Sequence, residues 1–150
     1  MQTSVGQENE TGYDLTPYYM FKFSVRSELT RKYYERRITR FLDFIEFSPS
    51  KDTEKRFNDF ARSARINVDW AFNKIITFLQ FQKERTERGE ITPATLSNFV
   101  KALKVFCETS NVTIPWKKIS RGLPHPSQSA NDRAPTINEI KKLLSIQIGE

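Results

Sequence analysis

Residues 91–109 read ITPATLSNFVKALKVFCET and carry the sharpest helix signal in the chain. The Thr92 hydroxyl can accept a hydrogen bond from an otherwise unpaired backbone N–H, and Pro93 suits the first helical position because no N–H is needed there. Apolar side chains then recur at helical spacing, at Leu96, Phe99, Val100, Leu103 and Phe106. The segment is therefore predicted to be a helix with one buried face.

The face of this segment roughly opposite the apolar stripe is polar and positively charged. It carries Ser97, Asn98, Lys101 and Lys104. Contact with a DNA groove requires such a face, because phosphates attract the cations and base edges exchange hydrogen bonds with polar groups. This helix is therefore the first candidate nucleic-acid surface in the chain.

Three further segments show apolar residues at helical spacing. The first is expected over residues 27–47 and the second over residues 51–64. The third begins at Asn67 or Asp69 and reaches Arg88, with Gly89 as its C-cap. Four helices and few strand-like alternations predict an all-α chain.

Residues 67–88 are apolar on two sides of the expected helix. Val68, Phe72, Ile75, Ile76 and Leu79 mark one side, and Trp70, Phe78 and Phe81 mark much of the other. A helix apolar on two sides is usually central, with neighbours packed both ways. The alternative for the second side is a protein interface.

A basic row runs along the helix expected over residues 27–47. It consists of Lys32, Arg36 and Arg40, flanked by Tyr33 and Arg37. Like charges at i, i+4 and i+8 repel one another. Two interpretations stay open: an ordinary solvated face, or a row that faces phosphates.

The charge balance of the whole chain favours an anionic partner. The formal net charge is +6 at pH 7. Residues 1–25 carry Lys22 against Glu8, Glu10 and Asp14, so the positive excess lies in the remaining chain. A basic body suggests a polyanion, most simply nucleic acid, and an inert basic surface is the alternative.

Residues typical of catalytic or metal sites are scarce. Cys107 is the only cysteine, which excludes an internal disulfide and a multi-cysteine zinc site, and its place beside an apolar face predicts a buried structural thiol. The only histidine, His125, lies between two prolines, and no glycine-rich phosphate loop follows a strand. We therefore expect no metal, no cofactor, no small-molecule substrate and no self-contained active site.

The rest of the chain predicts a folded unit with extensions. Residues 1–25 are expected to be a disordered tail and an aromatic arm that packs across the domain or contacts DNA or a second protomer; residues 26–120 form the folded domain. Residues 121–135 form a proline-rich linker in which Arg121 and Arg133 could touch a phosphate backbone. Thr136 and Glu139 form a capping box, so residues 136–150 are expected to begin a second domain.

No stretch of about 18 consecutive apolar residues exists in the sequence, and the N-terminal residues lack an apolar signal core. We therefore expect a cytoplasmic protein that has no membrane partner.

This order of elements resembles the N-terminal core-binding domain of the tyrosine recombinases, the phage-integrase family. The segments that carry the resemblance are TRKYYERRI and FLDFI at 30–38 and 41–45, TPATL and KALKVF at 92–96 and 101–106, and RAPT with the following EI and LL at 133–144. The similarity covers roughly residues 26–146.

The resemblance implies a fold, a partner and a set of contacts. The fold would be a four- to five-helix SAM-like orthogonal bundle, followed by a linker and the first helix of an absent catalytic domain. The bundle would form half of a C-shaped clamp on double-stranded DNA, with its first and fourth helices facing the major groove. A homo-oligomer on the DNA is a further partner that the resemblance allows. The implied DNA-binding residues are Lys32, Tyr33, Arg36, Arg37, Arg40, Thr95, Ser97, Asn98, Lys101 and Lys104.

The sequence departs from the full family pattern, because the catalytic motifs are missing. All five tyrosines lie at positions 13, 18, 19, 33 and 34, in the first quarter of the chain, whereas the family's tyrosine nucleophile lies near the end of its catalytic domain. No catalytic residue carries over, and this chain alone is not expected to cut or rejoin DNA. The alternative function is a helical protein-interaction module that uses Trp70, Phe78, Phe81 and the arm from Tyr18 to Phe23.

Overall fold

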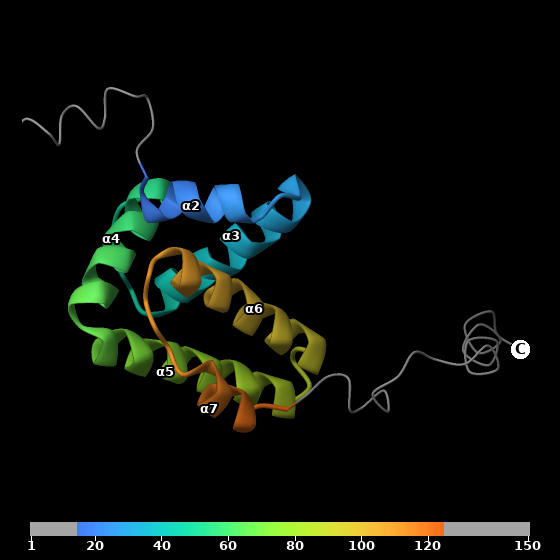
Figure 1. Cartoon of the computed structure of the whole chain (residues 1–150). Coiled ribbons are helices and arrows are strands. Elements are labelled where there is room, and N and C mark those ends of the chain that lie inside the picture. Colours follow the sequence, from blue (N-terminus) through green and yellow to red (C-terminus); the bar gives the residue numbers. More distant parts are fainter. Residues whose placement is uncertain (1–14, 125–150) are drawn as a thin grey trace, which may run out of the picture.

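The computed structural model describes residues 15–124, and the regular structure in this range is entirely helical (Figure 1). The helices are α2 (Pro17–Ser24), α3 (Glu28–Phe44), α4 (Thr53–Ile66), α5 (Val68–Glu87), α6 (Pro93–Thr109) and α7 (Trp116–Arg121). The all-α prediction is confirmed. None of these helices is both long and apolar enough to cross a membrane.

Side-chain caps set the starts of the helices. The Thr92 hydroxyl accepts a hydrogen bond from the Thr95 backbone N–H at 3.1 Å, and Pro93 occupies the first helical position, as predicted. Ser27 and Asn67 cap α3 and α5 in the same way. Asp52 caps α4, so that helix starts two residues later than predicted. Capping satisfies backbone N–H groups that have no partner inside the helix.

Helix α6 is the central element of the bundle. It crosses the middle of the molecule and packs against α2, α3 and α5 (Figure 1). Helix α5, over the residues expected to be central, packs against α3, α4 and α6, and both of its predicted apolar sides hold buried residues. Ile75 and Leu79 are buried on one side and Phe78 on the other, whereas Val68, Ile76 and Phe81 stay more than a third exposed.

Phenylalanine rings dominate the core where the helices meet. The Phe57 and Phe106 ring centroids are 4.9 Å apart and join α4 to α6. The Phe78 ring of α5 meets Phe41 of α3 at 5.4 Å and Phe99 of α6 at 5.2 Å, in edge-to-face contacts. Such pairs are favourable because the positive edge of one ring meets the negative face of the other. The aromatic residues thus hold α3, α4, α5 and α6 around one core.

The aromatic arm expected before residue 26 belongs to this core in the described range. Residues 17–24 form α2, which packs against α4 and α6. Phe21 is fully buried and Val25 is nearly so. The Tyr18 hydroxyl donates a hydrogen bond to the Glu35 carboxylate on α3 at 2.9 Å. The packed core therefore starts before residue 26, the expected domain boundary.

The C-terminal boundary also differs from the expectation. Helix α7 continues to Arg121, the first residue of the predicted linker, and Leu123 packs against the core. The predictions for residues 1–14, for His125 and Arg133, and for the capping box with residues 136–150 lie outside the described residues.

Candidate nucleic-acid interface

The predicted row on α3 lies on the surface. The side chains of Lys32, Arg36 and Arg40 are exposed, and they lie across the helix from Ile38, which is fully buried. Lys32 has an ion pair with Glu28 at 3.8 Å, in which both side chains are exposed. Exposed pairs of this kind contribute little, because water and salt screen them. The row is therefore available for contact with an anion.

The Tyr33 ring contacts two of the cations on this helix. The guanidinium carbons of Arg36 and Arg37 lie 5.5 Å and 5.8 Å from the centroid of its ring. A cation beside an aromatic face is held by the negative charge of the ring face. Tyr33 is 43% exposed, so the two arginines are held at the surface and not drawn into the core.

The predicted face of α6 is also exposed where it is charged. Lys101 and Lys104 are exposed, whereas Thr95, Ser97 and Asn98 are half-buried. The Thr95 hydroxyl lies 3.1 Å from the Thr92 hydroxyl at the start of the helix. Thr95 therefore takes part in the helix cap and is a weaker candidate for contact with DNA than Ser97 or Asn98.

A hollow beside α3 and α6 shows which stripes of the two helices are neighbours. Its volume is about 610 Å³, and it is lined by Thr30 and Tyr34 of α3, Val105 of α6 and the α2–α3 turn with Arg26. Residues three or four apart share one side of a helix. Arg37 therefore lies on the α3 stripe that follows Thr30 and Tyr34, and Lys101 lies on the α6 stripe next to Val105.

The same geometry separates members of the predicted α3 row. Lys32 and Arg36 are each two positions from Tyr34, which places them about 160° around the helix from the side beside α6. Lys32 is paired with Glu28 on its own helix, away from α6. Tyr33, Arg37 and Arg40 lie closer to α6 in angle. Arg37 and Lys101 thus lie on the two stripes that line the hollow, whereas Lys32 and Arg36 lie further around α3.

Charge pairing differs across the described residues. Arg36, Arg37, Arg40, Lys101 and Lys104 have no carboxylate within 4 Å there. The six cations that do have such a partner are Lys32, Lys55, Arg56, Arg62, Arg85 and Arg88. Positive charge on α3 and α6 is therefore mostly not neutralised within residues 15–124.

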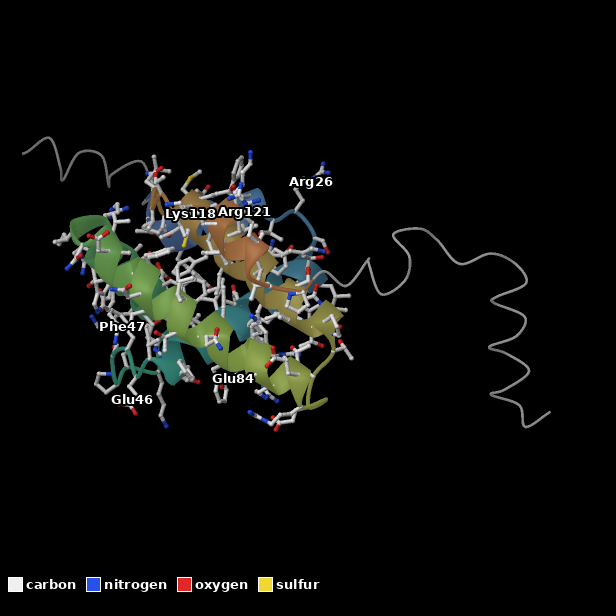
Figure 2. All side chains as sticks on the ribbon, turned by 90° about the horizontal axis from the view of Figure 1, so that it is seen from below. Arg26, Glu46, Phe47, Glu84, Lys118 and Arg121 are labelled. Atoms are coloured by element: carbon white, nitrogen blue, oxygen red, sulfur yellow. The ribbon has the colours of Figure 1, made fainter. Side chains whose placement is uncertain are left out.

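Sequence reasoning gave no site to three basic residues outside the two predicted helices: Arg26 in the α2–α3 turn and Lys117 and Lys118 on α7. It named Arg121 as a linker residue that could touch a phosphate backbone, and the structure places Arg121 at the end of α7. Figure 2 shows Arg26, Lys118 and Arg121 along one edge of the molecule and Glu46 and Phe47 toward the opposite edge. The run WKKISR, in which three of six residues are basic, was the available signal for the α7 group.

Other chemistry is limited within residues 15–124. Burial raises the pKa of the Cys107 thiol to about 12, so the buried thiol of the prediction is confirmed and is not a thiolate nucleophile at neutral pH. No group of three or more His, Cys, Asp or Glu side chains in this range could hold a metal ion.

Comparisons of the chain with protein-family models, with curated proteins and with solved structures find no match.

Proposed function

We propose that this chain is a helical domain that binds double-stranded DNA, with the build of the half-clamp that precedes the catalytic domain of tyrosine recombinases. The observation that carries the proposal is the unpaired positive charge on two helices that pack together, α3 and α6. Sequence order alone supports the recombinase part and the SAM-like topology.

Electrostatic contact with the DNA backbone dominates this mode of binding. Arg37, Arg40 and Lys101 contact phosphates, and Arg36, which lies further around α3, is a weaker candidate for this contact. Each phosphate that is neutralised releases counterions, so the binding constant falls as salt rises. Asn98 and Ser97 are the candidates for base edges, because their amide and hydroxyl groups can both donate and accept hydrogen bonds.

Salt titration of single variants tests the phosphate contacts. Lys101→Ala and Arg37→Ala should each lower the slope of log K against log salt by about one unit. The measurement is fluorescence anisotropy of a labelled duplex at several salt concentrations. Non-specific binding in the range of about 10⁻⁴ to 10⁻⁶ M is expected at physiological salt.

Lys51→Ala is the matched control, because Lys51 is exposed and lies in the loop between α3 and α4, outside the two helices assigned to the DNA contact. Its slope should stay that of the parent chain. Equal slopes for all three variants would overturn the assignment of α3 and α6 to the DNA contact.

The alternative function keeps only part of its aromatic surface. Phe78 and Phe21 are 1% and 0% exposed, so neither can form a protein-binding surface, whereas Phe81 and Phe23 are 39% and 71% exposed. Trp70 is half-buried against Phe47 and Phe60. Light scattering after size exclusion, run beside the DNA titration, separates the two functions, since a stable oligomer that ignores DNA would favour the interaction module.

A further inference from the structure

A second basic hollow lies between α6 and α7, away from the residues that the sequence analysis assigned to DNA contact on α3. Its volume is about 300 Å³. The lining residues are Lys104 from α6 with Trp116, Lys117, Ser120 and Arg121 from α7. Four of these five residues belong to one short helix, so a single element presents most of the hollow.

Every side chain that lines this hollow within the described residues can donate a hydrogen bond. Lysine and arginine only donate, the tryptophan indole has one N–H donor, and the serine hydroxyl can donate as well as accept. Lys104, Lys117 and Arg121 have no ion pair within residues 15–124. The group that matches such a lining is an anion whose oxygens only accept, and phosphate is the common biological example.

A second hollow that Trp116 also lines provides an internal contrast. It has a volume of about 440 Å³ and is lined by Trp116 together with Glu108, Asn111, Val112, Thr113 and Ile114. The Glu108 carboxylate repels anions, and the remaining lining is neutral. Two hollows therefore share one tryptophan, but only the hollow on the α7 side concentrates positive charge.

We propose that the hollow formed by Lys104, Trp116, Lys117, Ser120 and Arg121 is a binding site for a phosphate group. Lys104 lies three residues after Lys101 on α6, so the hollow continues the basic face of that helix. The expected source of the phosphate is the DNA backbone, which rests on the proposed function. A free phosphate or phosphate ester is the second source with the same chemistry.

Tryptophan fluorescence gives a direct readout, because the chain has two tryptophans. In a Trp70→Phe variant, Trp116 is the only one left, and its emission should change on titration with a duplex and with inorganic phosphate or pyrophosphate. A Trp116→Phe variant, which keeps Trp70, should show no such change. Far-UV circular dichroism verifies that both variants are folded.

Single substitutions of the cations decide the assignment. Lys117→Ala and Arg121→Ala should each weaken pyrophosphate binding several-fold and lower the salt slope of DNA binding by about one unit. Lys118→Ala is the control, because Lys118 is an exposed lysine of the same helix that does not line the hollow. It removes the same charge and should leave pyrophosphate binding nearly unchanged.

The outcomes separate this inference from the proposed function. A response to both duplex and pyrophosphate assigns the site to the DNA backbone, and a response to pyrophosphate alone supports a phosphate site with a free ligand. If Lys117→Ala and Arg121→Ala match Lys118→Ala in both assays, the inference is overturned. Salt slopes that still respond to Lys101→Ala would then leave the proposed function standing.

Discussion

Helix α4 and the pair α6 and α7 are both rich in positive charge, but they use it differently. On α4, Lys55 and Arg62 both contact the Asp59 carboxylate at 3.0 Å, and Arg56 contacts Asp43 at 2.8 Å. The basic residues of α6 and α7 have no such partner within residues 15–124: Lys101, Lys104, Lys117, Lys118 and Arg121. The number of cations is thus a poor guide to a binding surface, and the number of unpaired cations is a better one.

Arg56 is the clearest case of a cation used for structure. Its residue is 8% exposed, and its guanidinium donates to the Asp43 carboxylate and to the Phe47 carbonyl oxygen, at 3.0 Å from Nη2 and 3.3 Å from Nε. Both partners belong to the end of α3 and the loop after it. The guanidinium therefore fixes the connection between α3 and α4, where Glu46 and Ser48 have positive φ values of 54° and 62°.

The largest predicted effect that tests this difference between α4 and the pair α6 and α7 is a loss of stability. Arg56→Ala should lower the free energy of unfolding by about 2 kcal/mol, because the Phe47 carbonyl loses its partners and packing is lost. Urea denaturation followed by circular dichroism measures this, and DNA affinity of the folded variant should not change. Lys101→Ala is the comparison variant, with a stability change within about 0.5 kcal/mol. Equal losses in the two variants would break the contrast.

An intermediate effect is expected from the hydrogen bond between α2 and α3. Tyr18→Phe should lower the free energy of unfolding at neutral pH by about 1 kcal/mol, because the bond to Glu35 is lost. Thermal unfolding measures it. An unchanged melting temperature would show that this bond between α2 and α3 adds no stability.

The same tyrosine gives stability a pH dependence. Burial, with the hydrogen bond to Glu35, raises the pKa of Tyr18 from 10.0 to about 12. The neutral phenol is favoured in the folded state, so its contribution is complete below pH 10 and is lost as the pH rises toward 12. Tyr18→Phe should therefore flatten the alkaline decline in melting temperature, and a decline as steep as that of the parent chain would exclude Tyr18 as its source.

The smallest expected effect concerns the pairs that Asp59 forms on α4, in which the two cations are exposed and the carboxylate is half-buried. Asp59→Asn should lower the free energy of unfolding by at most about 1 kcal/mol, since exposed ion pairs are screened. The hydrogen bond from Lys55 lowers the pKa of Asp59, so its contribution is present at neutral pH and is lost as the pH falls through that pKa. Urea denaturation at low and high salt measures the difference. A loss as large as that of Arg56→Ala would mean that exposure does not separate the two kinds of pair.

Helices with a side-chain cap and a regular apolar stripe could be predicted from the sequence. Thr92 and Pro93 gave the start of α6, and Gly89, with a φ of +78°, gave the end of α5. Thr16 and Pro17 form the same start signal before α2, but only Phe21 among the four aromatic residues of this helix is buried, so no stripe identified the helix. Helix α7 has six residues and no side-chain cap, so it gave no periodic signal.

The sequence alone did not reveal which residues each charged or aromatic side chain contacts in the fold. The burial of Arg56 depends on Asp43 and Phe47, which are 13 and 9 residues away in the chain. The burial of Phe78 depends on Phe41 and Phe44 of another helix, which contact the side of α5 that the sequence assigned to either core packing or a protein interface. Periodicity identifies an apolar or basic face, but only the neighbouring helix decides whether it is covered.

The connection between α6 and α7 is ordered by contacts within the fold. The Arg65 guanidinium donates to the Ser110 carbonyl oxygen at 3.1 Å, Asn111 makes the turn with a φ of 60°, and Val112 and Ile114 are buried. A flexible connection would lose conformational entropy when a ligand ordered it, and that loss would weaken binding. Because the fold already orders this segment, the cations of α7 occupy fixed positions. An anion can therefore bind them with little rearrangement of the chain.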